Sequence, residues 1–357
     1  MDELAQRPIG PVREAVRTLS PGYFALVMAT GILSISMQIH HQDVTSDALL
    51  VVGCVAYAVL VLLNVWRAVA FPGEIVADLA DPRRAFGSFT FVAATDVLGT
   101  RLVGGGHHAV ALAALAVGWG AWIVLGYVVP WTAVVGRARR PLIADANGTW
   151  FIWVVASQSV AVLAAGLEGV TTSGRSEIAL LAVFSWSVGV FLYAAVGIFV
   201  AARLLVYDLR PADLTQPYWV AMGSAAISVV AGARIVEMTD APTVDATRGL
   251  VAGASVLFWS FATWLIPPLL AAGWWRHVRH RIPLRYDFTW WSVVFPLGMY
   301  GVAGEYLGQA DHLPALENIG SVESWFALAA WVVVFVAMLR HLLRTVVRPS
   351  AGPAASS

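Results

Sequence analysis

Long runs of apolar residues, separated by short polar segments, alternate along nearly the whole chain. A helix of about 20 apolar residues crosses the hydrocarbon core of a bilayer. The pattern therefore predicts ten membrane-spanning helices, at about residues 21–39, 47–66, 85–103, 108–130, 148–166, 177–200, 216–236, 247–272, 289–309 and 320–341. The predicted fold class is an all-α integral membrane protein.

The odd-numbered and even-numbered spans differ in character. Even spans, such as LLVVGCVAYAVLVLLNVW, are apolar throughout, whereas odd spans, such as VMATGILSIS and FVAATDVLGT, carry small and polar residues through their centres. Polar groups are costly when they face lipid, so they turn toward protein or water. We therefore expect the odd spans to form an inner ring and the even spans an outer one.

The odd spans also repeat one another. Each begins with aromatic residues, and alignment on Phe24, Phe89, Phe151, Trp219 and Trp291 gives a helical hairpin of roughly 65 residues that is used five times. Five hairpins arranged with quasi-fivefold symmetry leave a central hole unless large side chains fill it, and such a hole is a channel or a substrate path. The alternative is that the small residues only allow close helix packing.

One repeat carries an aromatic ring where the others do not. Four positions after the aligned aromatic residues, the fifth repeat has Phe295, followed by Pro296, and the other repeats have Met28, Ala93, Val155 and Gly223. A single Phe among smaller side chains closes a narrow path by filling it, and dewetting assists the closure. We predict that Phe295 and Pro296 form a gate; the alternative is a core Phe that packs between two helices.

The expected lining of the pore consists mainly of hydroxyls, amides and glycines on the odd spans. Neutral donors suit a weakly held anion, which must both enter and leave. The predicted lining residues are Thr30, Gly31, Ser34, Thr95, Asp96, Ser157, Gln158, Gly223, Ser224, Ser228 and Gly298.

Two carboxylates lie within these spans, Asp96 in the third and Glu305 in the ninth. One hypothesis is that they belong to intramembrane ion pairs, since Arg101 follows Asp96 closely, as Glu237 follows Arg234. The other hypothesis is a protonatable site that couples H⁺ to an anion. The sequence leaves both open.

Composition excludes most other classes of protein. Only 12% of the 357 residues are charged and the net charge is zero, which excludes a soluble domain and a nucleic-acid partner. The sequence contains a single cysteine, Cys54, and no metal-binding motif, nucleophile–base arrangement or phosphate loop, so we expect no metal, no cofactor and no enzyme activity.

Charge distribution predicts the orientation. With the N-terminus inside, 18 of the 22 arginines fall in cytoplasmic segments, which predicts that both termini are cytoplasmic. We expect a cytoplasmic segment at 1–19, the transmembrane domain at 20–342 and a disordered cytoplasmic tail at 343–357. The longest cytoplasmic linker is expected at about 67–84.

Three motifs resemble the tellurite-resistance/dicarboxylate transporter family, which includes the bacterial protein TehA and the plant slow anion channels. They are SPGYFALVMATGILS (20–34), NGTWFIWVVASQSVAV (147–162) and WWSVVFPLG (290–298). The resemblance implies five helical hairpins around a central pore, a homotrimer with one pore per subunit, and a Phe on the ninth helix that occludes the pore, matched here by Phe295. Asp96 and Glu305 depart from the largely neutral pores of that family.

The resemblance also implies the cargo. Members of that family transport small anions, including chloride, nitrate, malate and sulfite, across the cell membrane. The predicted function is therefore a gated, low-affinity anion channel in the cytoplasmic membrane of a bacterium. The alternative is a proton-coupled secondary transporter of a C4-dicarboxylate or of sulfite- or tellurite-type oxyanions, in which Asp96 or Glu305 takes the proton.

Overall fold

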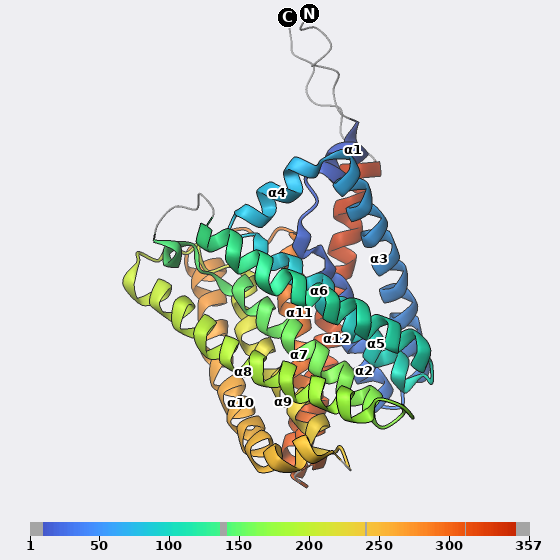
Figure 1. Ribbon diagram of the computed structural model, residues 1–357. Helices are drawn as coiled ribbons and strands as arrows, with labels where there is room; N and C mark the ends of the chain where they lie inside the picture. Colours follow the sequence, from blue (N-terminus) through green and yellow to red (C-terminus); the bar gives the residue numbers. More distant parts are fainter. Residues whose placement is uncertain (1–9, 136–140, 240, 311, 348–357) are drawn as a thin grey trace, which may run out of the picture.

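The computed structural model describes residues 10–135, 141–239, 241–310 and 312–347, which form helices and no strand. Ten helices in these ranges are long (Figure 1): α2 (Ala25–Ile39), α3 (Asp43–Ala70), α5 (Phe89–Gly104), α6 (His108–Val135), α7 (Phe151–Glu168), α8 (Arg175–Val206), α9 (Val220–Val236), α10 (Pro242–Trp274), α11 (Trp291–Ala310) and α12 (Pro314–Leu342). Within the described residues, eight of them are long and apolar enough to cross a membrane; the two that fall outside this group are α5 and α11.

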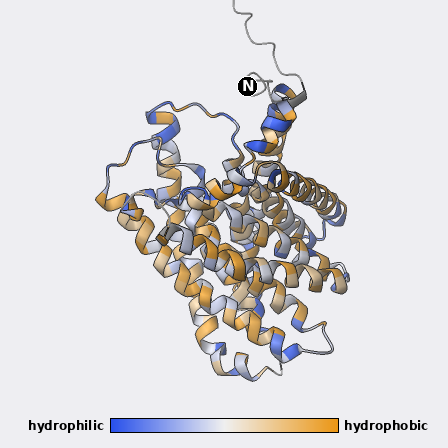
Figure 2. Cartoon of the chain, turned by 45° about the horizontal axis from the view of Figure 1, so that its top comes forward, coloured by the Kyte–Doolittle hydropathy of each residue, from blue (hydrophilic) through white to orange (hydrophobic). Residues whose placement is uncertain are grey.

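Five of the long helices lie at the centre. Contacts run from α2 to α5, α7, α9, α11 and back to α2, so these inner helices form a closed ring. Each inner helix also packs along the outer helix that follows it in sequence, α3, α6, α8, α10 or α12. The most apolar stretch of α2 is 83% buried against 17% for α3, so the outer helices present most of their apolar surface outward. Figure 2 shows hydrophobic residues along the long helices and hydrophilic residues mainly in the connections.

The inner helices all begin in the same way and at the same face. Each is preceded by a short 3₁₀ turn, at Pro21–Phe24, Ala85–Ser88, Gly148–Trp150, Gln216–Trp219 and Phe288–Trp290. The aromatic residues on which the sequence repeat is aligned lie at the end of these turns or directly after them. We call this the near face; it also carries the short helices α1 (Pro11–Arg17) and α4 (Pro72–Ala80) at the top of Figure 1. The far face holds the opposite ends of the inner helices.

Side-chain caps and glycines fix the 3₁₀ turns. Ser20, Asn147 and Asp287 each accept a hydrogen bond from the backbone N–H two residues later, at 3.3, 2.8 and 2.9 Å. Gly87 packs against the backbone of Gly22 in the neighbouring turn, where an added Cβ would lie 3.2 Å from the Gly22 nitrogen. A Cβ on Gly148 would overlap the peptide between Pro217 and Tyr218. Close backbone approach therefore draws adjacent inner helices together at the near face.

The structure differs from the sequence prediction at three places. The outer helices extend beyond the predicted spans by one or two turns, because the hydropathy pattern detects only the apolar part of each helix. The expected linker at 67–84 contains α4, which is held by a buried ion pair between Arg67 and Asp78 at 2.7 Å. In the expected tail at 343–357, Leu343–Val347 continue α12 as a π-helical turn, and residues 348–357 lie outside the described residues.

The glycine contacts generate a prediction about stability. Gly148→Ala forces a methyl group into the Pro217–Tyr218 peptide, so we expect it to lower the free energy of unfolding by about 1–3 kcal/mol. The matched control is Gly166→Ala on α7, where an added Cβ meets no atom within 4 Å. Thermal unfolding of both variants in detergent measures the difference. Equal melting temperatures would contradict the close packing of α7 against α9 at the near face.

Candidate functional site

The axis of the ring contains a narrow cavity of about 20 Å³, roughly the space for one water molecule. All five inner helices contribute to it, through the positions 8 and 11 residues after the aligned aromatic residues. The far end adds Arg234 and Tyr306, one turn farther along α9 and α11. The lining residues are Ile32, Ile35, Val97, Thr100, Ser159, Val162, Ile227, Val230, Arg234, Met299, Val302 and Tyr306. Apolar side chains therefore make most of the wall.

A much larger cavity, of about 930 Å³, opens at the near face. We call it the near vestibule. The 3₁₀ turns that precede all five inner helices line it, so the N-terminal ends of these helices, which carry partial positive charge, point toward it. Arginines outnumber carboxylates two to one in its wall: Arg83, Arg84, Arg203, Arg210, Arg276, Arg285, Asp145, Asp213 and Asp287. The near vestibule is therefore electropositive and attracts anions.

Tyr286 contributes a neutral hydroxyl to the wall of the vestibule. The Tyr286 hydroxyl lies 3.2 Å from that of Tyr23 and accepts a hydrogen bond from the Trp291 indole. Burial raises the pKa of Tyr286, so this hydroxyl stays protonated at physiological pH. It therefore adds no negative charge to the mouth of the ring.

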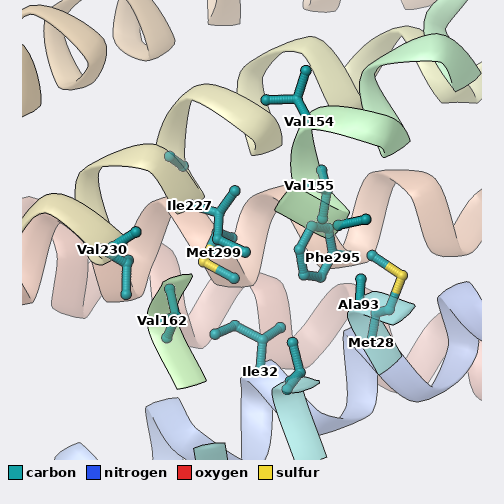
Figure 3. Close-up of a cluster of buried hydrophobic side chains, with 14 of the residues drawn as sticks. Met28, Ile32, Ala93, Val154, Val155, Val162, Ile227, Val230, Phe295 and Met299 are labelled. Atoms are coloured by element: carbon teal, nitrogen blue, oxygen red, sulfur yellow. The ribbon is translucent and has the colours of Figure 1, made fainter. Parts of the chain in front are cut away.

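Phe295 lies between the two cavities. On α11, Ser292 lines the near vestibule and Met299 lines the axial cavity, and Phe295 sits between them, one turn from each. Its side chain is 1% exposed. Figure 3 shows its ring beside Val155, Ala93 and Met28, which are the residues aligned with it in the repeat.

The fifth member of this layer, Gly223, brings two inner helices together. A Cβ on Gly223 would lie 2.8 Å from Cγ of Pro296, so α9 and α11 approach closely at the level of Phe295. Pro296 therefore serves this contact as well as ending the hydrogen-bond ladder of the preceding turn. The ring is narrow here, and the Phe295 side chain is the largest in its layer.

The polar residues expected to line the pore take other contacts. Thr30 accepts a hydrogen bond from Trp331 of α12 at 2.9 Å, Thr95 bonds Tyr57 of α3 at 2.8 Å, and Ser157 donates to the Ser185 carbonyl of α8 at 2.9 Å. All three lie two residues after the Phe295 layer, which rotates them by about 200° around the helix. They face the outer helices, and their hydrogen bonds link α2, α5 and α7 to α12, α3 and α8.

The remaining expected lining residues also contact neighbouring helices or their own. Ser34 bonds the Ser46 carbonyl of α3, and Gln158 bonds the Trp186 carbonyl of α8. Ser224 and Ser228 donate to carbonyls of α9 itself. Gly31 packs on Val97 and Gly298 on Ile32 and Leu33, which are contacts between inner helices. In their place, the axial cavity has Ser159, Thr100 and Tyr306 as its hydroxyl groups.

Asp96 is completely buried beside the axial cavity. One carboxylate oxygen accepts a hydrogen bond from Ser159 at 2.9 Å, and the other faces Gly118 of α6 without a hydrogen-bond partner among the described residues. Arg101 does not pair with it, because its guanidinium binds Asp47 of α3 at 2.8 Å. The ion pair considered for Asp96 and Arg101 is therefore absent between these described residues.

Glu305 has a different environment, at the far face between α11, α2 and α12. Its carboxylate lies 3.2 Å from His40 Nε2 and accepts a hydrogen bond from Ser324 at 3.1 Å. His40 also bonds the Ser36 carbonyl through Nδ1. The Glu305–His40 contact therefore joins the ends of α11 and α2, and neither side chain lines the axial cavity.

The sequence contains a signal for the axial positions that was not used. The positions 4, 8, 11 and 15 residues after each aligned aromatic residue lie on one face of a helix. On α11 these positions are Phe295, Met299, Val302 and Tyr306. Polarity points instead to the opposite face of the inner helices. It therefore does not indicate Tyr306, and it suggests Arg234 only as a partner of Glu237.

Comparisons with known proteins relate the chain to membrane proteins and transporters. An uncharacterized membrane protein of Mycobacterium tuberculosis is 66% identical over 158 residues, which cover 44% of this chain and 80% of that protein. An uncharacterized transporter of Methanocaldococcus jannaschii is 22% identical over 338 residues, covering 90% of this chain and 93% of that protein. Residues 18–339 match the family described as voltage-dependent anion channel. The resemblance in the three motifs is thus confirmed, and the chain belongs to the voltage-dependent anion channel family.

Proposed function

We propose that this protein is a gated channel for small anions such as chloride and nitrate, and that Phe295 closes its pathway. The observation that carries the proposal is the position of Phe295 on the ring axis, one turn from the near vestibule and one turn from the axial cavity. The pathway runs from the vestibule, past the Phe295 layer, through the axial cavity to the far face. Family membership supports transport of anions across a membrane.

Electrostatics support an anion rather than a cation as the cargo. The near vestibule combines an excess of arginines with five helix N-termini, and both features raise the local concentration of anions. The section beyond it is narrow and apolar, so an anion passes without a tight binding site that would hold it. Low affinity and rapid release are the properties of a channel.

The closed state follows from the size of the axial space. A cavity of about 20 Å³ with mostly apolar walls holds little water, and a dry segment is a barrier to ions. Removal of the Phe295 ring joins this space to the vestibule through a layer whose other members are Met28, Ala93, Val155 and Gly223.

The proposed membrane arrangement is ten spans in five hairpins, with quasi-fivefold symmetry. The helices α5 and α11 count as spans because their polar side chains are enclosed by the ring and by outer helices. We place the near face in the cytoplasm, with both termini, since most arginines lie on that side. The family resemblance supports a homotrimer with one pathway per subunit in the cytoplasmic membrane.

A second candidate function is a proton-coupled transporter of malate, sulfite or a tellurite-type oxyanion. The observation that favours it is the contact between Asp96 and Ser159, because Ser159 lines the axial cavity and its hydroxyl reaches a buried carboxylate. A carboxyl in this position exchanges a proton with the pathway through one hydroxyl. Glu305 is the less favoured proton site, since it faces His40 and α12 rather than the axis.

The first prediction concerns the gate. Phe295→Ala removes the ring between the two cavities, and we expect anion conductance in planar bilayers to rise by at least about an order of magnitude. Phe295→Leu retains part of the bulk and should give an intermediate current. The matched control is Phe326→Ala on α12, whose side chain is 64% exposed on the outer surface. An unchanged current in well-expressed Phe295→Ala protein would refute the gate.

The second prediction separates the channel from the carrier. Asp96→Asn keeps the shape of the side chain and its bond to Ser159 but removes the titratable group. For a channel, we expect the conductance of Phe295→Ala to be the same with and without Asp96→Asn. Uptake of malate or sulfite into liposomes is measured in parallel with an imposed pH gradient. Gradient-driven uptake that Asp96→Asn abolishes would instead establish the carrier.

The third prediction concerns orientation. In a Cys54→Ala background, Ser173→Cys places a thiol in the exposed far-face loop between α7 and α8, and Ala212→Cys places one at the exposed near face. We expect a membrane-impermeant maleimide added to intact cells to label Ser173→Cys only. Labelling of Ala212→Cys from outside would reverse the proposed orientation.

A further inference from the structure

We propose that Arg234, held by Tyr306 at the far end of the axial cavity, is an anion-binding site that sets the charge selectivity of the pathway. This inference rests on the proposed channel function and adds to it a specific residue, a location and a ligand class. The ligand is a small monovalent anion, such as chloride or nitrate, that has lost part of its hydration shell.

Arg234 is the cation of the axial wall. Among the described residues that line the axial cavity, it alone carries a positive charge, and its side chain is 33% exposed. It lies in the last turn of α9, one turn beyond Val230 of the same wall. An anion that leaves the apolar section toward the far face meets this guanidinium first.

Tyr306 holds the guanidinium in place. The Tyr306 hydroxyl accepts a hydrogen bond from Arg234 Nη2 at 2.5 Å, and the guanidinium carbon lies 4.4 Å from the centre of the Tyr306 ring. Stacking on an aromatic face restrains an arginine without neutralising its charge. Because Tyr306 belongs to α11, the site joins two inner helices across the cavity.

The charge of Arg234 is only partly offset, by one long ion pair. Glu237 lies 3.9 Å away and is half exposed, which is beyond hydrogen-bonding distance. The other arginines described at the far face differ in this respect. Arg101 pairs with Asp47 at 2.8 Å, Arg175 with Glu168 at 2.7 Å, and Arg248 with Asp245 at 2.8 Å.

This arrangement suits brief binding of an anion. A guanidinium has five N–H donors, and Tyr306 occupies one of them in the structure. The free donors replace water that an anion gives up in the apolar section, and partial exposure to solvent keeps the interaction weak enough for release. The same charge repels cations from the narrow end of the pathway. Among small anions, we expect planar nitrate to bind this guanidinium most strongly, because two of its oxygens match two parallel N–H groups.

The first test measures ion permeability through the open channel. In the Phe295→Ala background, Arg234→Gln keeps most of the side-chain length and removes the charge. We expect the chloride-to-sodium permeability ratio, measured from reversal potentials in salt gradients, to fall roughly tenfold. Arg175→Gln is the matched control, because this arginine lies at the far face outside the axial wall and should leave the ratio unchanged. An equal ratio with and without Arg234 would overturn the proposal.

A second measurement does not require an open channel. Purified protein with native Phe295 is heated in sodium nitrate and in sodium gluconate of equal ionic strength. We expect nitrate to raise the melting temperature of the native protein and of Arg175→Gln, and this rise to be lost in Arg234→Gln. A rise that persists in Arg234→Gln would overturn the site.

The outcomes distinguish the inference from the function on which it rests. If Phe295→Ala carries no anion current while nitrate stabilisation depends on Arg234, the gate proposal fails and the binding site stands. If current flows but neither selectivity nor stabilisation depends on Arg234, the channel stands and the site fails.

If Arg234→Gln does not fold, Arg234→Lys is the second variant, because lysine keeps the charge but lacks the planar guanidinium. We expect it to retain charge selectivity and lose the preference of nitrate over chloride, and an unchanged preference would contradict the site.

Discussion

Close approach of helix backbones at glycine is the constraint on which the rest of this structure depends. Gly87 packs on Gly22, Gly148 on the Pro217–Tyr218 peptide, and Gly223 on Pro296, so the chains of neighbouring repeats approach closely at these positions. Five helices joined this tightly leave an axial space for about one water molecule. A single benzyl group is therefore enough to separate the two cavities, and a wider ring would need several.

The fold was largely predictable from sequence, because the apolar runs and the aromatic repeat mark the long helices and their common starting level. The layer of Phe295 was also predictable, since alignment of the repeat gives the height of each residue along the axis. Rotation about each helix was not, and polarity was a misleading guide to it. Thr30, Thr95 and Ser157 face outer helices because a hydroxyl in lipid surroundings gains more from a protein partner than from an empty axis. Helix α4 was missed because its nine residues are too few for a periodic signal.

The charges are distributed in three zones along the proposed pathway. Arginines and helix N-termini surround the near vestibule, apolar side chains line the middle, and Arg234 stands at the far end. Buried carboxylates lie beside the axis rather than on it, with Asp96 behind Ser159 and Glu305 against His40. In the proposed channel, an anion thus meets favourable potential at both mouths. The free-energy barrier lies in the short apolar section, and the side chains there set the height of this barrier.

The five repeats share a backbone plan but differ in the side chain that each contributes to the Phe295 layer. Four repeats contribute Met28, Ala93, Val155 and Gly223, and the fifth contributes Phe295, whose ring is the proposed obstruction. If Phe295 is the gate, as proposed, a substitution at this one position changes the conductance of the pathway and leaves the scaffold intact. Under the same proposal, related proteins diversify from closed to constitutively conducting forms by changes at this position.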